Sequence, residues 1–141
     1  MTVRWAEVGV GDTLPHMTVE VTATVVVATA IATRDFMPVH HDRDYANQQG
    51  APDIFMNILS DTGFCSRFLT DWAGHDAFVT KLAIRLGVPV FPGATLVYTG
   101  SVTGVSRGEG DRSDEGYVEV AFRATTALGE HLTGTATVSL G

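Results

Sequence analysis

The stretch of residues 32–46, ATRDFMPVHHDRDYA, gathers side chains that could do chemistry in a chain built mostly of aliphatic and small residues. Asp35 and His40 are five residues apart on either side of Pro38, and the apolar Phe36 lies between them. A proline-containing turn can bring a carboxylate and an imidazole to face one space. Because histidine titrates near neutral pH, such a pair could hold a water molecule, deprotonate it and return a proton to a nearby carbon.

Two other interpretations of this stretch remain open. It could be a solvated loop, and Asp42, Arg43 and Asp44 are expected at the surface on that ground. It could be a metal site, but the adjacent His40 and His41 tend to point in different directions, and no cluster of His or Cys supplies the remaining ligands. The other histidines are scattered and are each expected at the surface or in a turn: His16, His75 and His131.

Nucleophilic catalysis finds little support elsewhere in the sequence. A strand–Gly-x-Ser-x-Gly–helix element, the mark of many serine hydrolases, is absent from the sequence. The single cysteine, Cys65, lies in an apolar helical pattern without a basic neighbour to activate its thiol. The pattern therefore disfavours both classes of hydrolase.

The elements that must position the Asp–His pair can be predicted from hydrophobic spacing. Residues 53–72 have helical periodicity with Gly74 beyond their end, and Asp53 is expected at the N-cap or in the first turn. Residues 22–33 are ambiguous, because β-branched side chains favour a strand while alanines allow a helix that ends near Asp35. Four later segments alternate as strands do and are separated by turn residues: 78–88, 95–106, 116–127 and 131–140.

This order of elements predicts an α+β fold in which one buried helix packs against one antiparallel sheet. A curled single sheet leaves its edge strands open, so we expect a dimer of like domains. The chain of 141 residues, 45% of them hydrophobic, predicts a single domain over residues 1–141.

Charge and composition exclude several classes of partner. The formal net charge of −7 disfavours nucleic acid, because phosphate binding needs a basic surface. The N-terminus does not have the pattern of a signal peptide, and the most apolar run, residues 25–32, is too short to cross a bilayer. One cysteine cannot form an internal disulfide. We therefore expect a cytoplasmic protein that contacts neither membrane nor nucleic acid.

The segment from Asp35 to Asp42, followed by Ala46, resembles the motif of the MaoC-like (R)-specific enoyl-CoA hydratases, roughly Gly-Asp-x-Asn-Pro-Leu-His-x-Asp-x-x-x-Ala. Residues 86–93, LGVPVFPG, are similar to that family's Pro-Val-x-x-Gly-Asp turn. The resemblance covers essentially the whole chain. It implies a hot-dog fold, in which a curled antiparallel sheet wraps a long central helix, and it implies a short helix at residues 22–33.

The resemblance also implies roles for individual residues. Asp35 and His40 would hold the catalytic water, which adds to Cβ of an α,β-unsaturated acyl-CoA while a proton goes to Cα. The family's oxyanion donor is the backbone N–H of a glycine in a His-Gly pair at the start of the central helix, and Ile58 aligns with that glycine. No cofactor or metal is implied.

Three motif positions depart from the family. Arg34 replaces the motif glycine, Met37 replaces its asparagine, and Asn57-Ile58 replaces the His-Gly pair. These changes indicate either decay of activity or a site reshaped for an unusual substrate. Because Asp35 and His40 carry the chemistry and both remain, we favour a reshaped site.

A narrower similarity is to the small subunit of the actinobacterial steroid side-chain enoyl-CoA hydratases. It rests on residues 39–44 (VHHDRD), 53–63 (DIFMNILSDTG) and 70–74 (TDWAG). It implies a heteromer with a second MaoC-like subunit. It also implies a substrate that is the CoA thioester of a steroid with a shortened, unsaturated side chain, hydrated at the ring carbon bearing that chain.

Further residues are expected to contact such a substrate. The apolar or adaptable side chains near the motif would line a wide pocket, although ordinary core packing explains them equally well: Phe36, Met37, Phe55, Met56 and Asn57. Lys81 and Arg85 share one face of a predicted strand and could bind the CoA phosphates. Two rival functions remain, a non-catalytic subunit that stabilises a catalytic partner and a hot-dog thioesterase.

Overall fold

The computed structural model describes residues 2–141. Its helices and strands follow in the order β1 (Met17–Glu20), α1 (Ala23–Ala32), α2 (Arg43–Gln48), α3 (Ile58–Ala73), β2 (Phe78–Leu86), β3 (Thr95–Arg107), β4 (Gly116–Thr126) and β5 (Gly129–Leu140). Short 3₁₀ turns occupy Trp5–Glu7, Pro38–His40 and Gly110–Arg112. The predicted α+β class is confirmed, and the four predicted strands correspond to β2–β5.

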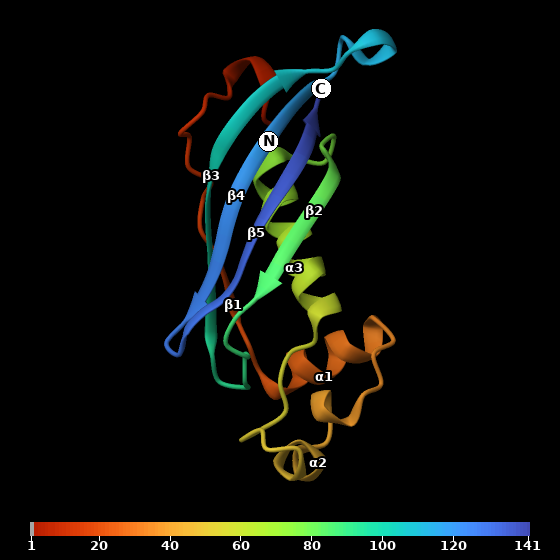
Figure 1. The fold of residues 1–141 in the computed structure, drawn as a ribbon, viewed down its shortest axis with the longest axis vertical. Helices are drawn as coiled ribbons and strands as arrows, with labels where there is room; N and C mark the ends of the chain where they lie inside the picture. Colours follow the sequence, from red (N-terminus) through yellow and green to blue (C-terminus); the bar gives the residue numbers. More distant parts are fainter. Residues whose placement is uncertain (1) are drawn as a thin grey trace.

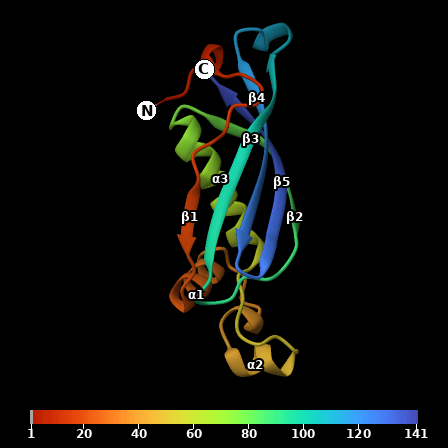
Figure 2. The same cartoon turned by 90° about the vertical axis from the view of Figure 1, so that its left-hand side faces the viewer.

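The five strands form one antiparallel sheet in the order β1-β3-β4-β5-β2. The sheet is open, with the short β1 at one edge and the nine-residue β2 at the other. It curves along its length, and α3 runs across its concave face (Figure 1). Figure 2 shows that α1 and α2 gather beyond one end of the sheet, next to the end of α3.

The core lies between α3 and the sheet. Cys65, Phe68 and Leu69 of α3 are at most 1% exposed. They face inward-pointing strand residues such as Tyr98 and Phe122, whose rings lie 5.7 and 6.2 Å from that of Phe68. The opposite side of α3 is exposed at its start, so within this chain the sheet covers one face of the helix and does not enclose it.

Residues 22–33 form the short helix that the family resemblance implied. The side chain of Thr22 caps α1 by accepting a hydrogen bond from the N–H of Val25 at 3.1 Å. The hydroxyl groups of Thr29 and Thr33 donate to carbonyls one turn earlier, so these β-branched residues satisfy their polar atoms within the helix. The N-cap at Thr22 and these hydroxyl-to-carbonyl hydrogen bonds stabilise the helix enough to outweigh the strand preference of the β-branched residues.

The end of α1 sets the direction of the chain into the Asp–His stretch. Arg34 has a left-handed backbone with φ of 58°. Its N–H donates to the carbonyl of Ile31, and the N–H of Asp35 donates back to the carbonyl of Ala30. These two bonds form a Schellman motif, which normally has glycine at the left-handed position. The backbone shape of the motif glycine is therefore kept at Arg34.

The region before α3 differs from expectation. The predicted helix from Asp53 begins five residues later, at Ile58, because the N–H groups of Phe55 and Met56 donate to the carbonyls of Val39 and Val90 rather than within a helix. Asp53 accepts hydrogen bonds from Arg43 and from the N–H of Ile54, each at 2.8 Å. The expected loop after His41 contains α2, capped by the side chain of Asp42. Helix α2 has only six residues, too few to show a clear hydrophobic period.

Candidate active site

The structure brings Asp35 and His40 together. Asp35 follows the left-handed turn at the end of α1, and His40 ends the 3₁₀ turn that begins at Pro38. The Nε2 atom of His40 lies 3.4 Å from the Oδ2 atom of Asp35. The Asp35 side chain is 25% exposed and that of His40 is 10% exposed, so the pair is mostly desolvated but still reachable from outside.

Hydrogen bonds fix the orientation of the imidazole ring. The Nδ1 atom of His40 lies 2.7 Å from the carbonyl oxygen of Phe55, which can only accept, so Nδ1 carries the proton. The ring of Phe55 also packs edge-on against the imidazole, with centroids 5.1 Å apart. In neutral His40, Nε2 is then an acceptor that faces the Asp35 carboxylate, another acceptor. Only a proton on Nε2 or a donor such as water between the two groups satisfies both atoms.

Both oxygens of Asp35 have further partners. Oδ1 accepts from the backbone N–H of Met37 at 3.3 Å. Oδ2 accepts from the side-chain amide of Asn57 at 3.1 Å. Asn57 immediately precedes Ile58, the first residue of α3, whose backbone N–H points out of the helix end without an acceptor in the helix. The expected oxyanion donor thus lies one residue from a group that contacts the Asp35 carboxylate.

An exposed apolar rim surrounds this pair. Of the nine large hydrophobic residues exposed in the described part of the chain, five lie at the end of α1, just after it, or at the start of α3: Ile31, Phe36, Met37, Ile58 and Leu59. Phe36 is 64% exposed. Among the other expected pocket residues, Phe55 is half-buried against His40, whereas Met56 is 4% exposed and belongs to the core.

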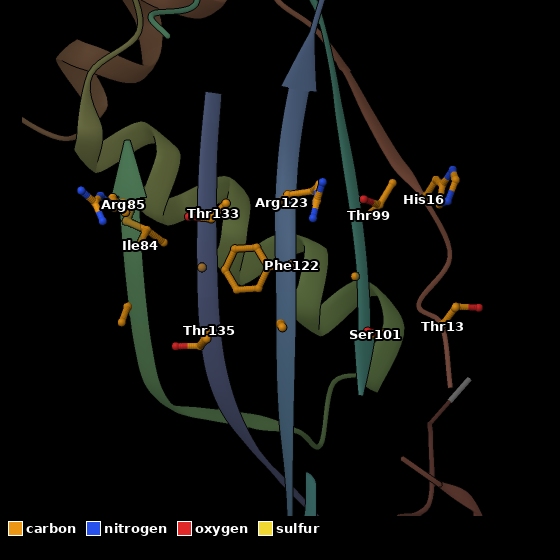
Figure 3. A pocket seen from close by; sticks show the side chains of 14 residues that line it. Thr13, His16, Ile84, Arg85, Thr99, Ser101, Phe122, Arg123, Thr133 and Thr135 are labelled. Carbon is orange, nitrogen blue, oxygen red and sulfur yellow. The ribbon is translucent and has the colours of Figure 1, made fainter. Parts of the chain in front are cut away.

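The residues expected to bind CoA phosphates lie elsewhere. Lys81 and Arg85 are on the edge strand β2, on the face of the sheet turned away from α3. Figure 3 shows Arg85 in an open hollow of about 710 Å³ over the strands, with α3 behind them. Arg123 and His16 also line this hollow, and the Asp–His pair is not part of it. A role in CoA binding for Lys81 and Arg85 stays a prediction.

A second Asp–His pair was missed by the sequence analysis. His131, expected at the surface or in a turn, is 2% exposed, and its Nε2 lies 2.7 Å from Oδ1 of the buried Asp61 on α3. The register of β4 with β5 passes from Ala124–Leu132 to Thr125–Glu130, so His131 is a bulged residue. A bulge turns a side chain against the strand alternation, and alternation alone could not show this.

The chain belongs to the MaoC-like domain family, whose sequence profile matches residues 8–124. The fold and the Asp–His pair agree with this assignment, and the resemblance inferred from the sequence is confirmed. Among residues 2–141, no helix is long and apolar enough to span a membrane. Within the same range, no group of three or more His, Cys, Asp or Glu side chains could hold a metal ion.

Two individual relatives resemble this chain over nearly its whole length. The chain is 43% identical over 131 residues to the beta subunit of the 3-oxo-4,17-pregnadiene-20-carboxyl-CoA hydratase of Mycobacterium tuberculosis, covering 93% of this chain and 95% of that one. The crystal structure of the ChsH1-ChsH2 complex from the same organism contains a chain that matches with a TM-score of 0.87 and 42% identity, covering 94% of this chain and 98% of that chain.

A more distant structure supports the fold. The (R)-hydratase from A. caviae involved in PHA biosynthesis matches with a TM-score of 0.82 at 23% identity, covering 96% of this chain and 98% of that chain. The predicted hot-dog fold is confirmed by these matches.

Proposed function

We propose that this chain is a subunit of an enoyl-CoA hydratase, which adds water across the α,β double bond of a CoA thioester. The observation that carries the proposal is the Asp35–His40 pair, two acceptors 3.4 Å apart in a partly desolvated site at the start of α3. That arrangement suits a group that donates to both acceptors and is polarised by them, as a nucleophilic water would be. The family assignment supports the same reaction.

The reaction follows from this geometry. A water molecule bridges Nε2 of His40 and the Asp35 carboxylate from their open side and donates to both. As the water oxygen bonds to Cβ, the pair accepts one of its protons, and a proton is returned to Cα, so that H and OH add across the double bond. Negative charge develops on the thioester oxygen, and a backbone N–H at the start of α3 is suited to stabilise it. Ile58 supplies that N–H.

The departures from the family motif leave the backbone of the site intact. Arg34 has the left-handed conformation that suits glycine, and the N–H of Met37 still binds Asp35. Asn57 keeps a polar contact to the same carboxylate from the end of α3. Since Asp35 and His40 lie 3.4 Å apart with the three altered side chains in place, this geometry supports a working site over a decayed one.

A second MaoC-like subunit would complete the site. The apolar rim around Asp35 and His40 is open in this chain and would be covered by a partner or by a bulky substrate. The free edge of β2 carries exposed Phe78 and Leu86 near its two ends and could pair with a strand of the partner. The matching complex contains two different chains, ChsH1 and ChsH2, which supports a heteromer.

The substrate we propose is a steroid enoyl-CoA with a shortened side chain. Support comes from the relative's name, which describes a pregnadiene carboxyl-CoA hydratase. The exposed side chains of Phe36 and Met37 suit a large apolar ring system near the catalytic pair. A cytoplasmic location remains a prediction from the sequence.

A hydration assay tests this function. The chain is co-expressed with candidate MaoC-like partners from its own genome, and loss of enoyl-thioester absorbance is followed with steroid and straight-chain enoyl-CoAs. We expect activity with the steroid ester that Asp35→Asn abolishes. Activity that survives Asp35→Asn would place the chemistry in the partner and make this chain a scaffold. Release of free CoA thiol would instead indicate a thioesterase.

A further inference from the structure

The side chain of Asn57 occupies an unusual position for its type. Asn57 is the N-cap residue of α3, where an asparagine side chain normally accepts a hydrogen bond from the first turn of its helix. Here the side chain accepts from no backbone N–H of the first turn; its oxygen faces the Ser60 hydroxyl and its amide nitrogen donates toward Asp35. The residue is 1% exposed, so its amide must find all its partners within the protein.

Every polar position of this amide is used. The Nδ2 group donates to Oδ2 of Asp35 at 3.1 Å and to Oγ1 of Thr33 at 3.0 Å. The Thr33 hydroxyl donates its own proton to the carbonyl of Thr29, so toward Asn57 it can only accept. The hydroxyl of Ser60, also buried, donates to Oδ1 of Asn57. The amide therefore has one orientation, with its donors toward Asp35.

This arrangement joins two parts of the proposed chemistry. Oδ2 of Asp35, which Asn57 binds, is the same oxygen that faces Nε2 of His40. At the other end, Asn57 is covalently next to Ile58, whose N–H is the proposed oxyanion donor. Because the side chain does not cap α3, it leaves the N–H groups of the first turn available to a substrate oxygen.

We propose that Asn57 is a positioning residue, which fixes the Asp35 carboxylate relative to the N-terminus of α3 so that the base and the oxyanion donor keep one geometry. Thr33 and Ser60 hold Asn57 from either side. This inference rests on the proposed hydratase function, and it assigns Asn57 a role in the rate of the chemical step rather than in contact with the substrate.

Variants of Asn57 in the assembled complex test the role. Asn57→Leu keeps a similar volume but removes the donor, and we expect kcat to fall by about 100-fold with KM changed less than about threefold, because a small misplacement of a catalytic group has effects of that order. Asn57→Asp places a second carboxylate against Oδ2, and we expect the acid side of the kcat/KM profile to move up by about one pH unit or more. A side chain with only a structural role would not move this profile.

Milder variants and a control complete the series. Ser60→Ala and Thr33→Val loosen the amide without removing its bond to Asp35, and we expect losses of about three- to tenfold. Thr70→Val removes a hydroxyl that donates to a carbonyl near the far end of α3, and it should leave both kcat and the pH profile unchanged. Thermal melts confirm that each variant is folded, and Asn57→Asp provides an isosteric variant if Asn57→Leu does not fold.

Crystal structures separate this inference from the proposed function. We expect the Asp35 carboxylate to leave its position beside His40 in Asn57→Leu and to keep it in Thr70→Val. If the wild-type complex hydrates no enoyl-CoA, the proposed function fails, and an undisplaced Asp35 in Asn57→Leu would then also overturn the positioning role. In an active complex, Asn57→Leu with kcat within threefold of wild type would overturn it directly.

Discussion

Residues 2–141 contain three Asp–His pairs, of which the exposed neighbours His75 and Asp76 form one, and the other two share one chemistry and differ in access. Asp35 and His40 lie 3.4 Å apart at the end of the molecule where α1 and α3 meet, with the carboxylate a quarter exposed. Asp61 and His131 lie 2.7 Å apart between α3 and the sheet, at 0% and 2% exposure. Both α3 and the sheet seal the second pair from any substrate.

This difference determines which pair a substrate could reach. At the outer pair, the histidine is held by a backbone carbonyl, and Oδ2 of Asp35, which also accepts from Asn57, faces Nε2 and can share a further donor with it. At the inner pair, His131 contacts Asp61 directly, and its Nδ1 also lies 2.6 Å from the carbonyl of Val88. Two groups that bind each other directly in a closed core contribute structure, although Oδ2 of Asp61 has no partner there. The distance between the two side chains and their exposure to solvent distinguish the pairs, because the residue types are the same.

The largest contrast is expected from matched carboxylate changes at the two pairs. Asp35→Asn should reduce hydration by about 10³-fold, because general acid–base groups contribute on that order, while its stability stays within about 0.5 kcal/mol. Turnover and urea unfolding of the assembled complex measure both. A loss of stability as large as that of an inner-pair variant would show that the outer pair is structural too.

The inner pair should show the reverse pattern. Asp61→Leu leaves His131 buried without its partner, and we expect a loss of about 3 kcal/mol in the free energy of unfolding with activity per folded molecule kept within a few fold. The double variant Asp61→Leu/His131→Leu should be less destabilised than the sum of the two single variants, since it leaves neither member of the pair buried without the other. Additive losses in urea unfolding would contradict direct coupling.

The inner pair also predicts how stability changes with pH. Burial raises the pKa of Asp61 more than the hydrogen bond from His131 lowers it. For His131, burial lowers the pKa. The hydrogen bond and charge of Asp61, together with the Val88 carbonyl, raise the pKa by more than burial lowers it, so the net shift is upward. Both upward shifts mean that the folded state keeps protons on Asp61 and His131 to a higher pH than the unfolded chain does.

The stability that comes from His131 is therefore complete below the ordinary histidine pKa of about 6.5 and is lost as the pH rises through its higher folded-state pKa. The stability that comes from Asp61 is complete only below the ordinary aspartate pKa of about 3.9 and is lost as the pH rises above it. Thermal melts between pH 6 and 9 should show a steeper fall for the wild type than for Asp61→Leu/His131→Leu. Equal slopes would mean that the pair does not bind its proton more tightly in the folded state.

A smaller effect is expected at Arg34, which leads into the outer pair. Left-handed backbone costs a non-glycine residue about 1 kcal/mol or more, partly offset by the greater freedom of glycine when unfolded. Arg34→Gly should therefore stabilise the chain by about 0.5 kcal/mol, and Arg34→Ala should bring no gain. Urea midpoints distinguish these variants, and a stabilising Arg34→Ala would argue against backbone strain as the cause.

The smallest effect is expected at Cys65, one turn along α3 from Asp61. Burial, with the charge of Asp61, raises the pKa of its thiol to about 12. The thiolate is therefore scarce at neutral pH, and we expect no labelling by iodoacetamide in the native state and full activity in Cys65→Ala. Rapid labelling would show that the closed region around the inner pair opens to solvent.

The sequence predicted the parts of this molecule that depend on local pattern. Alternation located β2–β5, and the spacing of Asp35 and His40 around Pro38 predicted their approach. It missed what depends on contacts between distant residues. The side chain of Asn57 reaches Asp35 across 22 residues, and no periodicity encodes that bond. The position of His131 depends on a bulge, and the late start of α3 depends on hydrogen bonds from the preceding backbone to the distant carbonyls of Val39 and Val90.

Arg34 also bears on how relatives of this chain are recognised. The left-handed turn before Asp35 survives although the glycine that usually makes it has been replaced. A search that requires that glycine would pass over such chains, whereas a search for the turn itself, with a carboxylate directly after it and an imidazole five residues further on, would retain them. The backbone conformation at this position is therefore a better criterion for such relatives than the residue type found there.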